Sequence, residues 1–190
     1  MKSTWKKWSI VGVAIVTLGI AGGIYATSIP QKNVANTNVT TPENTAPTAI
    51  PVSVWDRNIQ SYTGTSEVTV YRSPSCGCCG EWVKHLERHG FQVKDIQTDD
   101  METIKAEQGL PSDLASCHTA VVDGYVLEGH IPASDVIALL NEKPDIAGIA
   151  VPGMPLGSPG MEAGDRKQDF AVLAFDDAGE VEVFQEHQGY

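Results

Sequence analysis

Basic residues are scarce in this chain of 190 residues: 13 lysines and arginines stand against 24 aspartates and glutamates, for a formal net charge of −11. A surface this acidic repels phosphate backbones, which argues against nucleic acid as a partner. The sequence also lacks a Ser/His/Asp arrangement and a glycine-rich phosphate loop. Cysteine is scarce too, with four in all, and those four residues carry the chemistry considered below.

The N-terminus has the pattern of an export signal. A basic stretch, Met1–Trp8, precedes an uncharged apolar run, Ser9–Ala26. Cleavage after Ala26 or Ser28 would release a soluble protein. Retention would leave a membrane anchor at residues 9–26, because roughly 17–18 apolar residues just span a bilayer of about 30 Å. In both cases the lysines before the run predict an exported body, in the periplasm or anchored to the inner membrane facing it.

Residues 1–28 are therefore a signal peptide or transmembrane anchor, and residues 29–54 are expected to be a disordered linker. The linker is rich in Asn, Thr and Pro and has no apolar periodicity. Such a tether suits a domain attached to a membrane, which favours the retained anchor. The globular domain is expected to occupy residues 55–190.

Hydrophobic patterning predicts an α/β domain. The expected strands are Val68–Tyr71, Phe91–Ile96, Thr119–Val122, Tyr125–Leu127, Phe170–Phe175 and Glu180–Gln185, and the expected helices are Cys78–His89, Met101–Gln108 and Val136–Asn141. The order β-α-β-α-β-β-α predicts a thioredoxin-like sheet with flanking helices, in which a helical crossover joins a parallel first pair of strands. A Gly/Pro loop with two methionines, Val151–Glu162, and a C-terminal β-hairpin follow it.

The first helix carries an apolar stripe with spacing i, i+3, i+4 and i+7, formed by Cys79, Trp82, Val83 and Leu86. Two histidines, His85 and His89, stand four residues apart, a spacing that can hold a metal. We interpret them as solvated residues on the exposed face, and His187 as part of the C-terminal tail.

The candidate functional residues are the four cysteines. Cys76, Cys78 and Cys79 stand at the start of the first helix, where unpaired N–H groups and the helix dipole favour thiolate over thiol. Cys117 directly precedes the third expected strand. In a thioredoxin-like topology that strand begins beside the first helix's N-terminus, so the four sulfurs should converge.

Three interpretations of these cysteines remain open. Soft-metal binding fits thiolates, which select Cu(I) or zinc. Disulfide exchange fits the C-x-x-C pair, with Cys76 attacking a disulfide and Cys79 resolving it. Two structural disulfides fit less well, because adjacent Cys78 and Cys79 pair poorly and three thiols within four residues can engage only one distant partner, Cys117.

Other side chains favour the metal. Met154 and Met161 lie in the Gly/Pro loop, where they have no helical stripe to join. Their thioethers are soft ligands that prefer Cu(I), whereas zinc favours Cys with His. His118 follows Cys117 directly and is a candidate ligand or tuning group, and His130, before Ile131-Pro132, is a further candidate.

Several ordered motifs resemble a known family: Ser-Pro-Ser-Cys-Gly-Cys-Cys-Gly, Cys117-His118-Thr119, Glu128-Gly-His-Ile-Pro-Ala133, and the Gly/Pro loop. From about Glu67 to Gln185 the chain is similar to the CopG-type copper-resistance proteins, a thioredoxin-like domain of unknown function. The resemblance implies an exported domain that binds copper as one Cu(I) or a cluster of several, with redox activity. Its partners would be copper ions and other periplasmic copper-handling proteins.

The resemblance carries Cys76, Cys78, Cys79 and Cys117 over as the family's cysteines, and His118, His130, Met154 and Met161 as its other motif positions. Two departures from thioredoxin weaken a general dithiol oxidoreductase assignment. Cys78 replaces the usual proline of Cys-Gly-Pro-Cys, and His118 stands about where thioredoxins carry the cis-proline that shields the site from metal.

Overall fold

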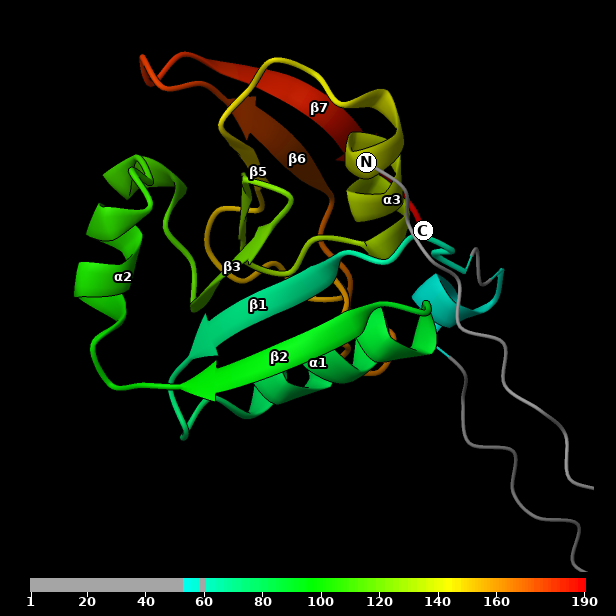
Figure 1. Ribbon diagram of the computed structural model, residues 1–190. Helices are drawn as coiled ribbons and strands as arrows, with labels where there is room; N and C mark the ends of the chain where they lie inside the picture. The colour runs from blue at the N-terminus through cyan, green and yellow to red at the C-terminus, as the bar shows by residue number, and fades with distance from the viewer. Residues whose placement is uncertain (1–52, 59–60) are drawn as a thin grey trace, which may run out of the picture. The chain divides into compact units, whose positions relative to one another are not determined.

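The computed structural model describes residues 53–58 and 61–190 (Figure 1). The predicted export signal, residues 1–28, and the linker up to residue 52 lie outside the described residues. Among residues 53–58 and 61–190, none of the helices has the length and hydrophobicity of a membrane span.

A seven-stranded mixed sheet in the order β2-β1-β3-β4-β5-β6-β7 forms the centre of the domain. β1 (Glu67–Arg72) pairs parallel with β2 (Gln92–Gln97) and antiparallel with β3 (His118–Val122). β3 forms a hairpin with β4 (Tyr125–Glu128) around Asp123 and Gly124, whose φ values of 48° and 89° are those of a tight hairpin turn. These strands and their helices confirm the predicted thioredoxin-like order.

One strand, β5 (Gly148–Ala150), is absent from the sequence prediction. It pairs parallel with β4 and antiparallel with β6 (Phe170–Phe175), which continues into β7 (Val181–His187). A Cβ at Gly148 would collide with the Val126 carbonyl, so glycine permits this close pairing. Through β5 the predicted closing hairpin extends the thioredoxin-like sheet instead of packing beside it.

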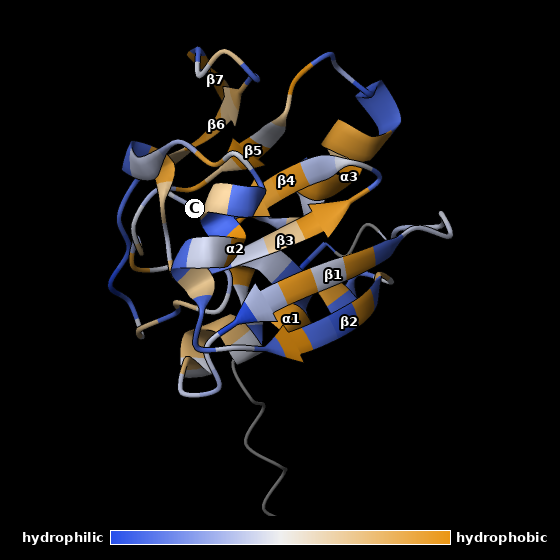
Figure 2. Cartoon of the chain, turned by 60° about the vertical axis from the view of Figure 1, so that its left-hand side comes forward, coloured by the Kyte–Doolittle hydropathy of each residue, from blue (hydrophilic) through white to orange (hydrophobic). Residues whose placement is uncertain are grey.

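Helices cover both faces of the sheet. α1 (Gly77–Arg88) and α3 (Ala133–Glu142) lie behind it and α2 (Met101–Glu107) in front, as Figure 2 shows. The predicted stripe of α1 is buried, and its residues Trp82, Val83 and Leu86 lie in the main core with Val68 and Val70 of β1. Alternate residues of β4, β5 and β6 point to a smaller cluster around Leu114, which lies in the 3₁₀ turn Ser112–Leu114.

Two expectations about histidines are wrong. His85 and His89 are 1% and 3% exposed, because the 3₁₀ turn Val54–Asp56 covers this face of α1. Asp56 Oδ1 lies 3.2 Å from His85 Nδ1 and 3.3 Å from His89 Nε2. His187 belongs to β7, not to a free tail, and its Nε2 lies 2.7 Å from Asp135 Oδ2.

Candidate metal centre

The N-terminus of α1 carries three of the predicted cysteines. Cys76 is the N-cap, and its sulfur accepts a hydrogen bond of 3.3 Å from the Cys79 amide. The preceding turn is closed by the Cys76 N–H, which donates to the Ser73 carbonyl at 3.1 Å. Cys76 and Cys78 are partly exposed, whereas Cys79 is buried on the apolar stripe. The free amides and positive dipole of the first turn therefore face these sulfurs.

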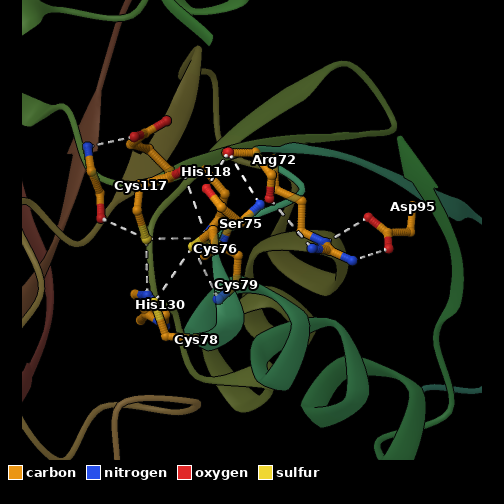
Figure 3. Close-up of a disulfide and its surroundings, with 12 residues drawn as sticks. Arg72, Ser75, Cys76, Cys78, Cys79, Asp95, Cys117, His118 and His130 are labelled. Carbon is orange, nitrogen blue, oxygen red and sulfur yellow. Dashed lines mark hydrogen bonds and ion pairs between the residues drawn. A yellow bond between two sulfur atoms is a disulfide. The ribbon is translucent and has the colours of Figure 1, made fainter. Parts of the chain in front are cut away.

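The fourth cysteine, Cys117, joins them from the start of β3. All four sulfurs lie within 4.8 Å of one another, as the sequence predicted. Cys76 and Cys79 form a disulfide, and Cys78 and Cys117 are free thiols (Figure 3). The Cys78 sulfur lies 3.5 Å from that of Cys76. All four can act as thiolates only after two electrons have reduced the disulfide.

Burial keeps Cys117 protonated in the absence of a cation. Burial, and next the proximity of Cys78, raise the pKa of the Cys117 thiol to about 11. A metal ion would replace that proton, because a cation at the sulfur offsets the loss of solvation.

His130 directs a ring nitrogen at the Cys117 sulfur. Its Nδ1 donates to the Pro159 carbonyl at 2.8 Å, which leaves the lone pair of Nε2 facing Cys117 Sγ at 3.1 Å (Figure 3). Burial lowers the pKa of His130, which favours the neutral ring. A neutral imidazole whose second nitrogen is held by a carbonyl is the arrangement of a metal-ligating histidine.

His118 lies close to the same sulfur, with its ring edge-to-face against that of His130 at a centroid distance of 5.0 Å. Its Nδ1 is 3.6 Å from Cys117 Sγ, and its ring packs on Trp82 at a centroid distance of 4.4 Å. Burial, and then the proximity of the His130 ring, hold the pKa of His118 well below its usual range. Its Nε2 is buried and makes no hydrogen bond. Cys117, His118 and His130 thus form a second group of donors that shares Cys117 with the first.

The Gly/Pro loop packs against this centre through its glycines. Gly160 has φ +82°, and a Cβ there would lie 2.8 Å from the Cys78 carbonyl and the Trp82 amide. Met161 follows directly and is partly exposed. Gly153 donates to the Ala115 carbonyl at 3.3 Å, so Met154, which is 55% exposed, lies beside the residues that lead into Cys117. Both predicted methionines therefore adjoin segments that border the centre.

The sequence analysis did not predict the ion pair between Glu128 and Lys105, which lies next to the segment that contains Cys117. Glu128, fully buried at the end of β4, pairs with Lys105 of α2 at 2.5 Å. Burial raises the pKa of Glu128, and Lys105 opposes this shift. The sequence does contain one indication of this pair, because the acidic residue Glu128 directly follows the apolar strand Tyr125–Leu127.

Asp56, His85 and His89 are close enough together to hold a metal, but His85 has no free lone pair to donate to one. The Ala133 N–H donates to His85 Nε2 at 3.0 Å, so Nδ1 carries the proton and donates to Asp56. We therefore interpret this cluster as a structural contact between the turn Val54–Asp56, α1 and α3.

The fold and the site together define a thioredoxin-like domain with a cysteine cluster that can bind a metal ion. Residues 114–161 match the family described as "Protein of unknown function, DUF411". A solved structure titled "Copper resistance protein copG- Form 2" is 45% identical, with a TM-score of 0.63, over 66% of this chain and 100% of that one. A second, "Copper resistance protein copG- Form 1", is 46% identical with a TM-score of 0.62, over 65% and 98%.

The chain belongs to the family of CopG copper resistance proteins. No curated protein matches its sequence.

Proposed function

We propose that this protein is an exported copper-binding protein that acts in copper resistance or homeostasis. It holds Cu(I) through Cys76, Cys78, Cys79 and Cys117. The observation that carries the proposal is the convergence of the four sulfurs within 4.8 Å. Clustered thiolates are soft ligands and select Cu(I) over the harder divalent ions.

His118, His130, Met154 and Met161 are the further ligands in this proposal. The two imidazoles are neutral and face the sulfur that both donor groups share. The thioethers add soft donors that, unlike thiols, cannot form disulfides.

The same centre can change the oxidation state of copper. In the proposed step, two Cu(II) ions take one electron each from the thiols of Cys76 and Cys79. The products are two Cu(I), the Cys76–Cys79 disulfide and two released protons. Cys78 and Cys117 are free thiols in the disulfide form, so they can hold Cu(I) after the step.

The proposed location rests on the basic and apolar segments of residues 1–28, which would act as a cleaved signal or as an anchor. In the anchored form, residues 29–54 tether the domain of residues 55–190 on the periplasmic side. Other periplasmic copper-handling proteins would deliver or receive the ion.

Cu(I) titration of the full chain, reduced and kept anaerobic in detergent, tests the proposal. Cu(I) competes with a chromogenic chelator, and copper per chain is counted alongside free thiols. We expect at least one tightly held Cu(I) with thiols protected in parallel, and a loss of copper in Cys117→Ser. Unchanged copper stoichiometry in Cys117→Ser would contradict the assignment. Met154→Leu and Met161→Leu test the thioethers, with Met101→Leu on α2 as the matched control.

A thiol-disulfide oxidoreductase is the second candidate, because the Cys76–Cys79 disulfide sits at a helix N-terminus. There the first-turn amides stabilise a released Cys76 thiolate. Insulin reduction by the metal-free, reduced protein tests this function. A rate no greater than that of Cys76→Ser rejects it.

A further inference from the structure

We infer that Glu128 is a positioning residue that holds Cys117 and His118 in place for the metal. The inference rests on the proposed function of the cysteine centre and adds a residue that contacts neither sulfur nor imidazole. Glu128 ends β4, directly opposite Thr119 of β3, and is fully buried.

Its carboxylate binds the chain on both sides of the Cys117–His118 pair. Oε1 accepts the Ser116 N–H at 2.5 Å, immediately before Cys117. Oε2 accepts the Thr119 hydroxyl at 2.7 Å, immediately after His118. One side chain therefore fixes the residues that flank both candidate ligands.

A carboxylate suits this position because Ser116 precedes β3 and its amide is outside the strand ladder. A fully buried amide without an acceptor costs about 1–3 kcal/mol, and the Ser116 amide is partly buried. The buried negative charge is in turn paired with Lys105, whose Nζ also donates to the Thr119 hydroxyl at 3.0 Å. α2 thus supplies the counter-charge from the face of the sheet opposite α1.

Backbone contacts near the Glu128 carboxylate also hold the segment of Cys117 close to the segment of His130. The Gly129 amide donates to the His118 carbonyl at 3.1 Å. A Cβ on Gly129 would lie 2.8 Å from the Ser116 side chain, so the segments before β3 and after β4 are in close contact. Loss of the carboxylate would free the Ser116–Cys117 segment while leaving the sheet paired beyond Thr119.

The test compares Glu128→Gln in the normal chain and in the Cys117→Ser background, by Cu(I) competition on the full chain. Gln keeps the size but removes the charge that pairs with Lys105 and one of the two acceptor oxygens, so it cannot accept from both Ser116 and Thr119. We expect Cu(I) binding to weaken by about 10–100-fold, the usual effect of removing the support of a metal ligand. In the Cys117→Ser background the same substitution should have a clearly smaller effect, because only His118 is then left for Glu128 to position. An equal loss in both backgrounds, or no loss in the folded variant, would overturn the inference.

Asp135→Asn is the matched control, because Asp135 is a buried carboxylate whose partner, His187, lies away from the sulfurs. It should lower stability and leave Cu(I) affinity unchanged. Thr119→Val removes only the hydroxyl donor and should give a smaller loss in the same direction, which keeps the inference testable where Glu128→Gln does not fold.

A copper-free measurement separates the inference from the proposed function. Native-state alkylation of Cys117, mapped by mass spectrometry, should be several-fold faster in Glu128→Gln than in the normal chain or in Asp135→Asn. If the normal chain retains no Cu(I), the proposed function fails, and these rates alone decide the role of Glu128. Equal alkylation rates in the three proteins would reject that role.

Discussion

His130 Nε2 lies 3.1 Å from the sulfur of Cys117, thirteen residues earlier in the chain, while the Pro159 carbonyl holds the opposite ring nitrogen. The carbonyl determines the tautomer, because it accepts only from a protonated Nδ1. The lone pair of Nε2 therefore meets the thiol proton in the metal-free protein. The same lone pair is available to an ion that displaces that proton.

His130→Ala should weaken Cu(I) binding by about tenfold or more, because the variant removes a donor that is already oriented. His187→Ala is the control, since His187 pairs with Asp135 away from the sulfurs. Competition with a chromogenic Cu(I) chelator measures both variants. Equal affinities would show that His130 only supports the fold.

Copper capacity should depend on the redox state of the Cys76–Cys79 pair. The oxidised chain offers two free thiols, Cys78 and Cys117, and the reduced chain offers four. We therefore expect more tightly bound Cu(I) in the reduced protein, by anaerobic titration with thiols counted before and after. Equal stoichiometry in both states would show that Cys76 and Cys79 add no copper-binding capacity.

Gly160→Ala should displace the Gly/Pro loop from α1. A Cβ at this position would lie 2.8 Å from two backbone atoms, and φ is +82°. Overpacking of this kind costs about 1–3 kcal/mol beyond the backbone strain. Gly153→Ala is the matched control, because φ is +68° there and no atom lies within 4 Å of the added Cβ. Chemical denaturation should show the larger loss for Gly160→Ala, and equal losses would contradict the packing described.

Stability should fall as the pH is lowered through the range set by His85. Burial lowers the pKa of His85 from 6.5 to about 4, and the neighbouring charge of His89 adds to this. Between these values the unfolded chain binds a proton that the folded chain does not, so the free energy of unfolding falls as pH falls from 6.5 to 4. The loss contributed by His85 is at most about 3 kcal/mol.

Urea denaturation between pH 7.5 and pH 4 compares the normal chain with His85→Gln, which cannot titrate. The variant should lose less stability over this range. His118 and His130 also have lowered pKa values and contribute to the pH dependence of both proteins. The contribution of His85 is therefore the difference between the two proteins in how much the free energy of unfolding changes with pH. Identical pH dependence in both proteins would contradict the role of His85.

The periodic parts of the fold could be predicted from the sequence. The stripe of Cys79, Trp82, Val83 and Leu86 is a local pattern, and an apolar face of this kind has to be buried whatever it packs against. β5 could not be predicted in this way, since its three residues are too few to show a period. Its pairing depends on the close approach that Gly148 permits between β4 and Phe175.

The histidines show the limit of local patterns more clearly. His85 and His89 are at polar positions of an amphipathic helix, which predicts exposure. Their burial depends on Asp56, which lies 29 and 33 residues away in sequence. The hydrophobic periodicity of α1 carries no information about a contact with a residue so distant in sequence.

The sequence by itself determined the four cysteines at a helix start and a strand start, and with them the soft-ligand chemistry. Residue type and local spacing are enough for that. Only the tertiary structure showed which groups surround the cysteines, namely the His130 ring held by Pro159 and the Glu128 carboxylate bonded on both sides of Cys117–His118. These features depend on directed hydrogen bonds between distant segments, and the folded backbone alone brings such donors and acceptors into range.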